Sequence, residues 1–214
     1  MAEQGARGRR GCFFYGGIAT GMALAFALVA AMLAWKARNE FTSSKPEPLP
    51  SVNLSEAEIN HTQQQVRAFQ LSVSRRQPTA PLQLTAGQIN ALIASEAPYQ
   101  ALRGKFYFTI DDDKLKAQVS LPAEEAGLKL PLFRGRYLNG VGTFSLAFDN
   151  GNLRIGLESL SIEGKPLPEA YSKRLRAQNL ASWLLQNPRA SMALERLQDV
   201  EVKGGRLIIM PKPD

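Results

Sequence analysis

The chain has very few residues of the kinds that perform covalent and metal chemistry. Its 214 residues include one cysteine, Cys12, and one histidine, His61. After residue 12 the chain has no cysteine, which excludes thiol catalysis and a thiolate zinc site there. A serine–histidine–carboxylate triad would depend on His61 alone, and a single histidine cannot form a multi-histidine metal site. We therefore expect no catalytic residue, no metal site, no cofactor and no enzymatic activity.

Carboxylates are the remaining candidates for chemistry, but their spacing selects none of them. Asp111-Asp112-Asp113 offers oxygen ligands of the kind that calcium takes, yet the EF-hand spacing is missing. Three acidic residues between strand-like segments are more typical of a turn. The sequence also has neither a glycine-rich phosphate loop nor a GxGxxG dinucleotide motif.

Charged residues are absent from residues 11–35, a run of 25 residues. As a helix this run would span about 37 Å, enough to cross a hydrocarbon core of about 30 Å. Arg7, Arg9 and Arg10 precede the run, so the positive-inside rule places residues 1–10 in the cytoplasm. A cleaved signal peptide is disfavoured because the run is long and ends in Trp35 and Lys36, an interfacial pair. We predict a single-pass protein of the lipid bilayer, with a basic cytoplasmic tail over 1–10, a transmembrane helix over 11–35 and a periplasmic or extracellular remainder.

Small residues recur at helical spacing within this run. Gly17 and Gly21 form a GxxxG motif, and Ala25 extends it. Such a stripe lets two helices approach closely, which favours a homodimer, although alanine and glycine are also common in helices of this kind.

Composition divides the rest of the chain into four segments. Residues 36–53 are a proline-rich linker, and residues 54–73 are an amphipathic stalk helix begun by a capping box at Ser55 and Glu58. Residues 74–81 form a second linker, and residues 82–214 are long enough for one exported domain. The stalk helix either packs on that domain or pairs with a second copy.

The exported domain shows strand and helix patterns without βαβ alternation, so we predict an α+β fold. Strands are expected at 82–84, 105–110, 115–121, 141–148, 153–162, 200–202 and 207–210, with helices at 85–95, 168–178 and 188–197. Three hairpin turns, at 111–114, 149–152 and 203–206, carry the aspartate, asparagine and glycine residues that tight turns need. The expected architecture is an antiparallel sheet of about six strands built from hairpins, with helices packed on one face.

The order of these parts resembles a known group of proteins. A single-pass anchor, the segment from Leu84 to Ile93, the turn Asp149-Asn150-Gly151 and the helix opening at Gly164–Pro168 are similar to uncharacterised extracytoplasmic domains of bacteria, of which the YpmS-like family is one. More distantly, residues 82–214 resemble the TULIP-like lipid-binding proteins. The resemblance implies a groove for an apolar ligand between sheet and helix, and it carries over no catalytic residue.

Two sets of residues are therefore candidates for binding. The expected lining of an apolar groove, or alternatively a filled core, is Leu92, Ile93, Phe106, Phe108, Phe144, Leu146 and Phe148. The expected contacts to anionic lipid headgroups, or alternatively a solvated surface, are Arg134, Arg136, Lys173, Arg174 and Arg176.

The net charge of +7 does not indicate nucleic-acid binding. Residues 1–38 hold five basic residues and one acidic residue, so more than half of the charge flanks the apolar run. We expect a membrane-anchored module that binds a lipid or another apolar ligand of the bacterial envelope. The alternative is a structural or assembly partner in an envelope protein complex, dimerising through the membrane and stalk helices.

Overall fold

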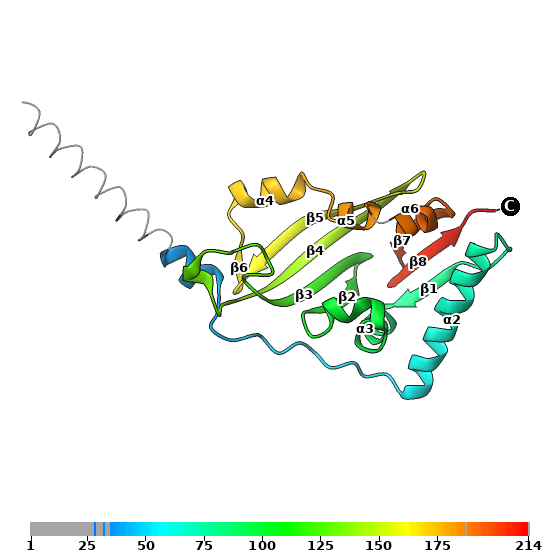
Figure 1. Ribbon diagram of the computed structural model, residues 1–214, viewed down its shortest axis with the longest axis horizontal. Coiled ribbons are helices and arrows are strands. Elements are labelled where there is room, and N and C mark those ends of the chain that lie inside the picture. The colour runs from blue at the N-terminus through cyan, green and yellow to red at the C-terminus, as the bar shows by residue number, and fades with distance from the viewer. Residues whose placement is uncertain (1–27, 29–31, 33–34, 187, 214) are drawn as a thin grey trace, which may run out of the picture.

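The computed structural model describes residues 28, 32, 35–186 and 188–213 (Figure 1). The predicted cytoplasmic tail, nearly all of the predicted transmembrane helix, and its stripe of Gly17, Gly21 and Ala25 lie outside the described residues. Within the described part of the chain, no helix is both long enough and apolar enough to cross a membrane.

The larger of two antiparallel sheets has five strands in the order β2-β3-β4-β5-β6. Their bounds are β2 Phe106–Asp111, β3 Lys114–Pro122, β4 Tyr137–Asp149, β5 Asn152–Ile162 and β6 Lys165–Pro166. Each strand pairs with the next along the chain, so the sheet is a meander of hairpins. The register shifts between Thr143 and Phe144, where β4 carries a bulge.

The smaller sheet has three strands in the order β1-β8-β7. Strand β1 spans Leu82–Thr85, β7 spans Leu197–Lys203 and β8 spans Arg206–Pro211. Leu82 pairs with Ile209, so this sheet joins the beginning of the predicted domain to its end. The prediction of α+β structure is confirmed, but the expectation of one sheet of about six strands is wrong, because β1, β7 and β8 form a sheet of their own.

Four tight turns have two successive residues in the left-handed region. Asp112 and Asp113, Asn150 and Gly151, and Gly204 and Gly205 all have positive φ, as the sequence predicted for these three hairpins. The fourth turn, at Glu163 and Gly164, connects β5 to β6 and was missed because β6 is only two residues long.

The helices surround the sheets rather than covering a single face. Helix α2 (Glu56–Ser74) and helix α3 (Ala86–Ser95) lie beside the small sheet and β2 (Figure 1). Three short helices, α4 (Glu169–Arg176), α5 (Ser182–Leu185) and α6 (Pro188–Leu194), follow β5 on the other side of the molecule. The chain also forms two 3-10 turns, η1 (Ala97–Leu102) and η2 (Pro131–Phe133).

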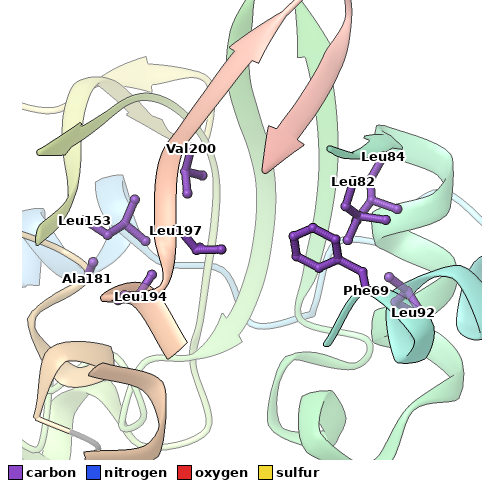
Figure 2. Packing of buried hydrophobic residues seen from close by; sticks show 9 residues of the cluster. All are labelled: Phe69, Leu82, Leu84, Leu92, Leu153, Ala181, Leu194, Leu197 and Val200. Carbon is purple, nitrogen blue, oxygen red and sulfur yellow. The ribbon is translucent and has the colours of Figure 1, made fainter. Parts of the chain in front are cut away.

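The main hydrophobic cluster runs from α2 to α6 across the small sheet. Figure 2 shows Leu197 and Val200 of β7 between two groups of side chains. Phe69 of α2 lies on one side with β1 and α3, and Leu153 of β5 lies on the other side with Ala181 and Leu194. Phe69 is only 8% exposed. Of the two alternatives left open for this helix, packing on the domain or pairing with a second copy, the structure shows α2 packed on the domain.

The predicted linker before α2 is also bound to the domain. Residues 35–41 are helical, and Ser43 forms a β-bridge with Tyr137, at the start of β4. The backbone N–H of Ser43 donates to the Tyr137 carbonyl at 2.9 Å, and the return bond is 2.8 Å long. Proline keeps the following residues extended, but they lie against the domain and do not act as a free spacer.

Candidate apolar cavity and N-terminal clamp

Helix α3 is held by hydrogen bonds to α2 on one side and to β2 on the other. A capping box at Thr85 and Gln88 begins the helix, and the Gln88 amide also donates to the hydroxyl of Thr62 on α2 at 3.3 Å. Asn90, which is 4% exposed, donates from Nδ2 to the Phe108 carbonyl at 2.7 Å. Its Oδ1 accepts from the Phe108 backbone N–H at 2.8 Å. These bonds hold α3 along the outer edge of β2.

An apolar cavity of about 140 Å³ lies where α3 and β2 meet the segment 44–53, which we call the strap. Three segments line it: Leu49, Pro50 and Val52 of the strap; Asn90, Ile93 and Ala94 of α3; and Arg103, Gly104, Phe106 and Tyr107 before and within β2. Most of the lining is hydrocarbon, so the cavity favours an apolar group over a charged one.

The strap is held over the cavity by a small polar network. The backbone N–H of Glu47 donates to Ser120 Oγ at 3.0 Å and to Asn139 Oδ1 at 3.1 Å. Asn139 returns a bond from Nδ2 to the Lys45 carbonyl at 3.1 Å. Asn139 is buried, at 5% exposed. Its side-chain amide supplies the strap with the hydrogen bonds that a neighbouring strand would otherwise make, because the alternate prolines of the strap lack N–H donors.

The volume of the cavity limits what it can hold. Small-molecule sites usually measure about 300–1,000 Å³, and an engineered cavity of about 150 Å³ holds benzene. A cavity of about 140 Å³ therefore suits one aromatic ring or one branched aliphatic group. A second cavity of about 110 Å³ lies between α2 and η1, where Arg67, Gln70 and Glu96 give it a more polar lining.

The structure divides the predicted apolar lining residues among several places. Ile93 and Phe106 line the main cavity, and the ring of Phe108 stacks on Phe106 with centroids 6.3 Å apart. Leu92 belongs to the core cluster and also borders the second cavity. The others lie away from the main cavity: Leu146 and Phe148 pack on the core cluster, and Phe144 lies over Gly142.

A second group of polar contacts clamps residues 35–43 to the large sheet. The Arg136 guanidinium donates to Thr42 Oγ1 at 3.0 Å, to the Arg38 carbonyl at 3.4 Å and to the Thr42 carbonyl. Arg38 in turn donates from Nε to the Leu132 carbonyl at 2.6 Å. Cations near a helix C-terminus also interact favourably with the helix dipole.

The predicted headgroup contacts therefore have different surroundings. Arg134 and Lys173 are exposed, whereas Arg136 is half-buried and bonded to backbone carbonyls. Arg176 pairs with Glu169 at 3.1 Å. Arg174 lies on α4, and its side chain is not among those the structure describes.

The acidic turn at the far end of the large sheet is stabilised by contacts within the protein. Lys116 donates to Asp111 at 2.6 Å, and this hydrogen bond lowers the pKa of Asp111 and raises the pKa of Lys116. Asp113 accepts from the backbone N–H of Gly205 at 3.2 Å, which joins two hairpin tips. Across the described residues, no cluster of histidine, cysteine and acidic side chains has the geometry of a metal site.

Three asparagines that shape the structure were missed by sequence reasoning. Asn90 and Asn139 are described above, and Asn179 donates to the Leu153 carbonyl at 2.9 Å while accepting from the Ile155 N–H at 3.0 Å. Each of these side-chain amides accepts from a backbone N–H and donates to a backbone C=O, as a neighbouring strand would. Nothing in a single sequence distinguishes such an asparagine from one in a turn, because its partners are distant along the chain.

Comparison with known proteins adds no relative: no family model, curated protein or solved structure matches this chain. The resemblance to YpmS-like and TULIP-like domains stays a prediction.

Proposed function

We propose that the protein is a single-pass membrane protein of the bacterial envelope whose exported α+β domain binds another envelope protein and performs no catalysis. The observation that supports this proposal most directly is the cavity between the strap, α3 and β2. Its volume of about 140 Å³ matches one apolar side chain, and surface pockets that a partner fills and shields from water hold the anchor residues of protein interfaces.

The backbone of β2 beside the cavity offers a second element of recognition. The Ser120 N–H bonds to the Lys105 carbonyl, whereas the Phe108 backbone bonds to Asn90 outside the sheet. The backbone N–H and C=O of every second residue in a strand point to the same side. Those of Phe106 therefore point, like those of Phe108, to the side of β2 that faces away from β3. An extended partner segment could pair there and insert one side chain into the cavity, a known mode of peptide binding.

Membrane anchoring is supported by the sequence and by the residues just before the domain. The uncharged run 11–35 has the length of a membrane helix. Leu28, Met32 and Trp35, the described large apolar residues of this region, are 61–76% exposed, so the domain does not bury them. A bilayer would bury them and would thereby account for their apolar character.

A lipid is the second candidate ligand, because the cavity is lined mainly by hydrocarbon. Its volume is below that of sites enclosing a whole small molecule, so a lipid would be held by only part of one chain. This difference in volume favours a protein partner over lipid carriage.

Site-specific photo-crosslinking tests the proposal in the full-length protein within its native membrane. A photoreactive residue replaces Ala94, exposed at the cavity rim, and a control replaces Ala68, exposed on α2. We expect one discrete protein adduct from position 94 and none from position 68. Val52→Trp, which places a large ring at the cavity, should abolish the adduct, whereas Val141→Trp on the exposed side of β4 should not.

The other outcomes separate the candidates. An adduct of lipid mass at position 94 would replace the protein-binding proposal with lipid binding. An identical adduct pattern at positions 94 and 68, or an adduct that survives Val52→Trp, would show that the cavity is not a binding site.

A further inference from the structure

The loop between β3 and β4 exposes an apolar side chain between two cations. Leu130 is 59% exposed, and its neighbour Lys129 and the nearby Arg134 are also exposed. The following residues, Leu132 and Phe133 of η2, are half-buried and attach the loop to the protein. Segments that lie on a membrane surface combine apolar side chains with basic ones, and this loop has both.

The loop is fixed to the segment that follows the predicted membrane helix. Arg38 binds the Leu132 carbonyl at 2.6 Å, and Arg136 binds Thr42 and the Arg38 carbonyl. Figure 1 shows residues 35–41, η2 and β6 together at one end of the molecule, with the C-terminus at the opposite end. The position of Leu130 relative to residue 35 is therefore set by several hydrogen bonds.

The residue at the start of this segment has the features of a membrane-interface anchor. Trp35 is 61% exposed, and the Arg38 guanidinium lies over its ring, 5.1 Å from the centroid. Tryptophan and basic residues concentrate at the headgroup level of a bilayer. If the chain leaves the bilayer at Trp35, a loop bound to Arg38 and Thr42 lies next to the headgroups.

The charges around Leu130 favour anionic lipid. Two acidic residues at this end are already paired within the protein: Glu40 with Lys165 at 3.2 Å and Glu125 with Lys105 at 2.7 Å. Lys129 and Arg134 have no acidic partner among the described residues, although Glu124 is exposed in the same loop. Basic side chains beside a bilayer are attracted by its negative surface potential.

From these contacts we infer that loop 127–135 is a second membrane contact, in which Leu130 enters the bilayer surface and Lys129 and Arg134 bind anionic phospholipid headgroups. This inference rests on the proposed membrane anchoring and adds to it the contact that fixes how the domain faces the bilayer. Arg136 is not part of the proposed lipid contact, because it is half-buried and its Nε and Nη2 donate to Thr42 and to the Arg38 carbonyl.

Fluorescence quenching in vesicles tests the inference with the full chain. Cys12→Ser removes the native thiol, and a single cysteine labelled with an environment-sensitive dye is placed at 130, at 28 or at 71. Position 28 precedes Trp35, and Leu71 is a comparably exposed leucine on α2, 49% against 59%. The vesicles contain phosphatidylcholine with phosphatidylglycerol, and a nitroxide lipid quenches dyes that lie in the bilayer.

We expect quenching and a blue shift of the emission at positions 28 and 130, and neither at 71. Lys129→Gln combined with Arg134→Gln should reduce quenching at 130 and remove its dependence on phosphatidylglycerol. Quenching at 28 without quenching at 130 would overturn the inference and leave the anchoring intact. A lack of quenching at 28 would overturn the anchoring itself, and equal quenching at 71 and 130 would show contact that does not depend on the loop.

Discussion

The side-chain amide of Asn90 forms two hydrogen bonds with the backbone of Phe108, of 2.7 and 2.8 Å, so that helix α3 occupies the position of a further strand. Asn179 forms the same kind of pair with Leu153 and Ile155 on β5, the strand on the opposite side of the meander. Free edges of a sheet promote pairing with other chains. Asn90 and Asn179 thus cover part of the backbone on the two outer sides of the meander. The outward-facing backbone of Phe106, beside the cavity, has no such asparagine partner among the described residues.

Asn90→Leu should destabilise the domain by about 1–3 kcal/mol, because it leaves the partly buried N–H and C=O of Phe108 without their Asn90 partners. Chemical denaturation of the variant measures the loss. Asn60→Leu on the exposed side of α2 is the matched control and should change stability by less than about 0.5 kcal/mol. Equal effects at the two positions would contradict a structural role for the Asn90 amide.

Phe69→Ala should cost about 3–5 kcal/mol, because it removes a buried ring from the core cluster. Leu71→Ala, on the same helix but 49% exposed, should cost less than about 0.5 kcal/mol. Denaturation followed by circular dichroism should show α2 and the sheets unfolding in one transition. A separate transition for α2 would support an independent stalk.

Two glycines should respond to alanine in opposite directions. At Gly87, in the first turn of α3, a Cβ would meet only Thr85 Oγ1 at 3.9 Å, so Gly87→Ala should stabilise by about 0.4–1 kcal/mol. At Gly140 on β4 a Cβ would lie 2.5 Å from the Ser161 carbonyl oxygen, so Gly140→Ala must displace β5 and destabilise. Thermal melts of both variants measure the difference, and a stabilised Gly140→Ala would refute the strand spacing.

Acid should weaken the capping box that begins α2. The hydroxyl and backbone N–H of Ser55 donate to the Glu58 carboxylate at 2.7 and 2.8 Å and lower its pKa. A carboxylate with a lowered folded pKa contributes stability above its unfolded pKa and loses it as the pH falls through the folded pKa. The stability difference between wild type and Glu58→Gln should therefore shrink in that acidic range.

Ser55→Ala should reduce this pH dependence, because it removes the hydroxyl that favours the ionised form of Glu58. Denaturant titrations at a series of pH values provide the measurement. A wild-type advantage that stays constant from neutral to acidic pH would contradict the assigned role of Glu58.

Arg136→Lys should loosen the attachment of residues 38–43, because an ammonium group cannot replace the several directed bonds of a guanidinium. Amide hydrogen exchange in this segment should accelerate by about fivefold if one net hydrogen bond is lost. Arg134→Lys, at an exposed position in the same loop, is the control and should leave exchange unchanged. Unchanged exchange in Arg136→Lys would show that the β-bridge and the bond from Arg38 to the Leu132 carbonyl hold the segment without the Arg136 guanidinium.

The local parts of the fold could be predicted because the sequence encodes them over a few residues. The turns at Asp112, Asn150 and Gly204 carry residues suited to positive φ, so the three hairpins and their strands were expected. The capping boxes at Ser55 and Thr85 marked the beginnings of α2 and α3 within two residues.

The distant pairings could not be predicted, because no local signal specifies a partner. Leu82 pairs with Ile209 at the other end of the domain, and this pairing is what creates a second sheet. The apolar side of α2 suits a stalk as well as a core, and only Phe69 in the cluster decides between them. Of the predicted apolar lining, Ile93 and Phe106 reach the cavity because the strap lies across them, and the strap looked like a free linker.

The connection between the helical residues 35–41 and β4 is short, so it links the orientation of that helix to the orientation of the large sheet. Thr42, 2% exposed, is the only residue between the helical segment and the bridge of Ser43 with Tyr137. A flexible tether would let the domain swing freely, whereas this joint transmits a tilt or rotation of the helix directly to β4. In a membrane-anchored protein, the orientation of the cavity would then follow the helix, and a torque applied within the bilayer would reach the proposed partner-binding surface.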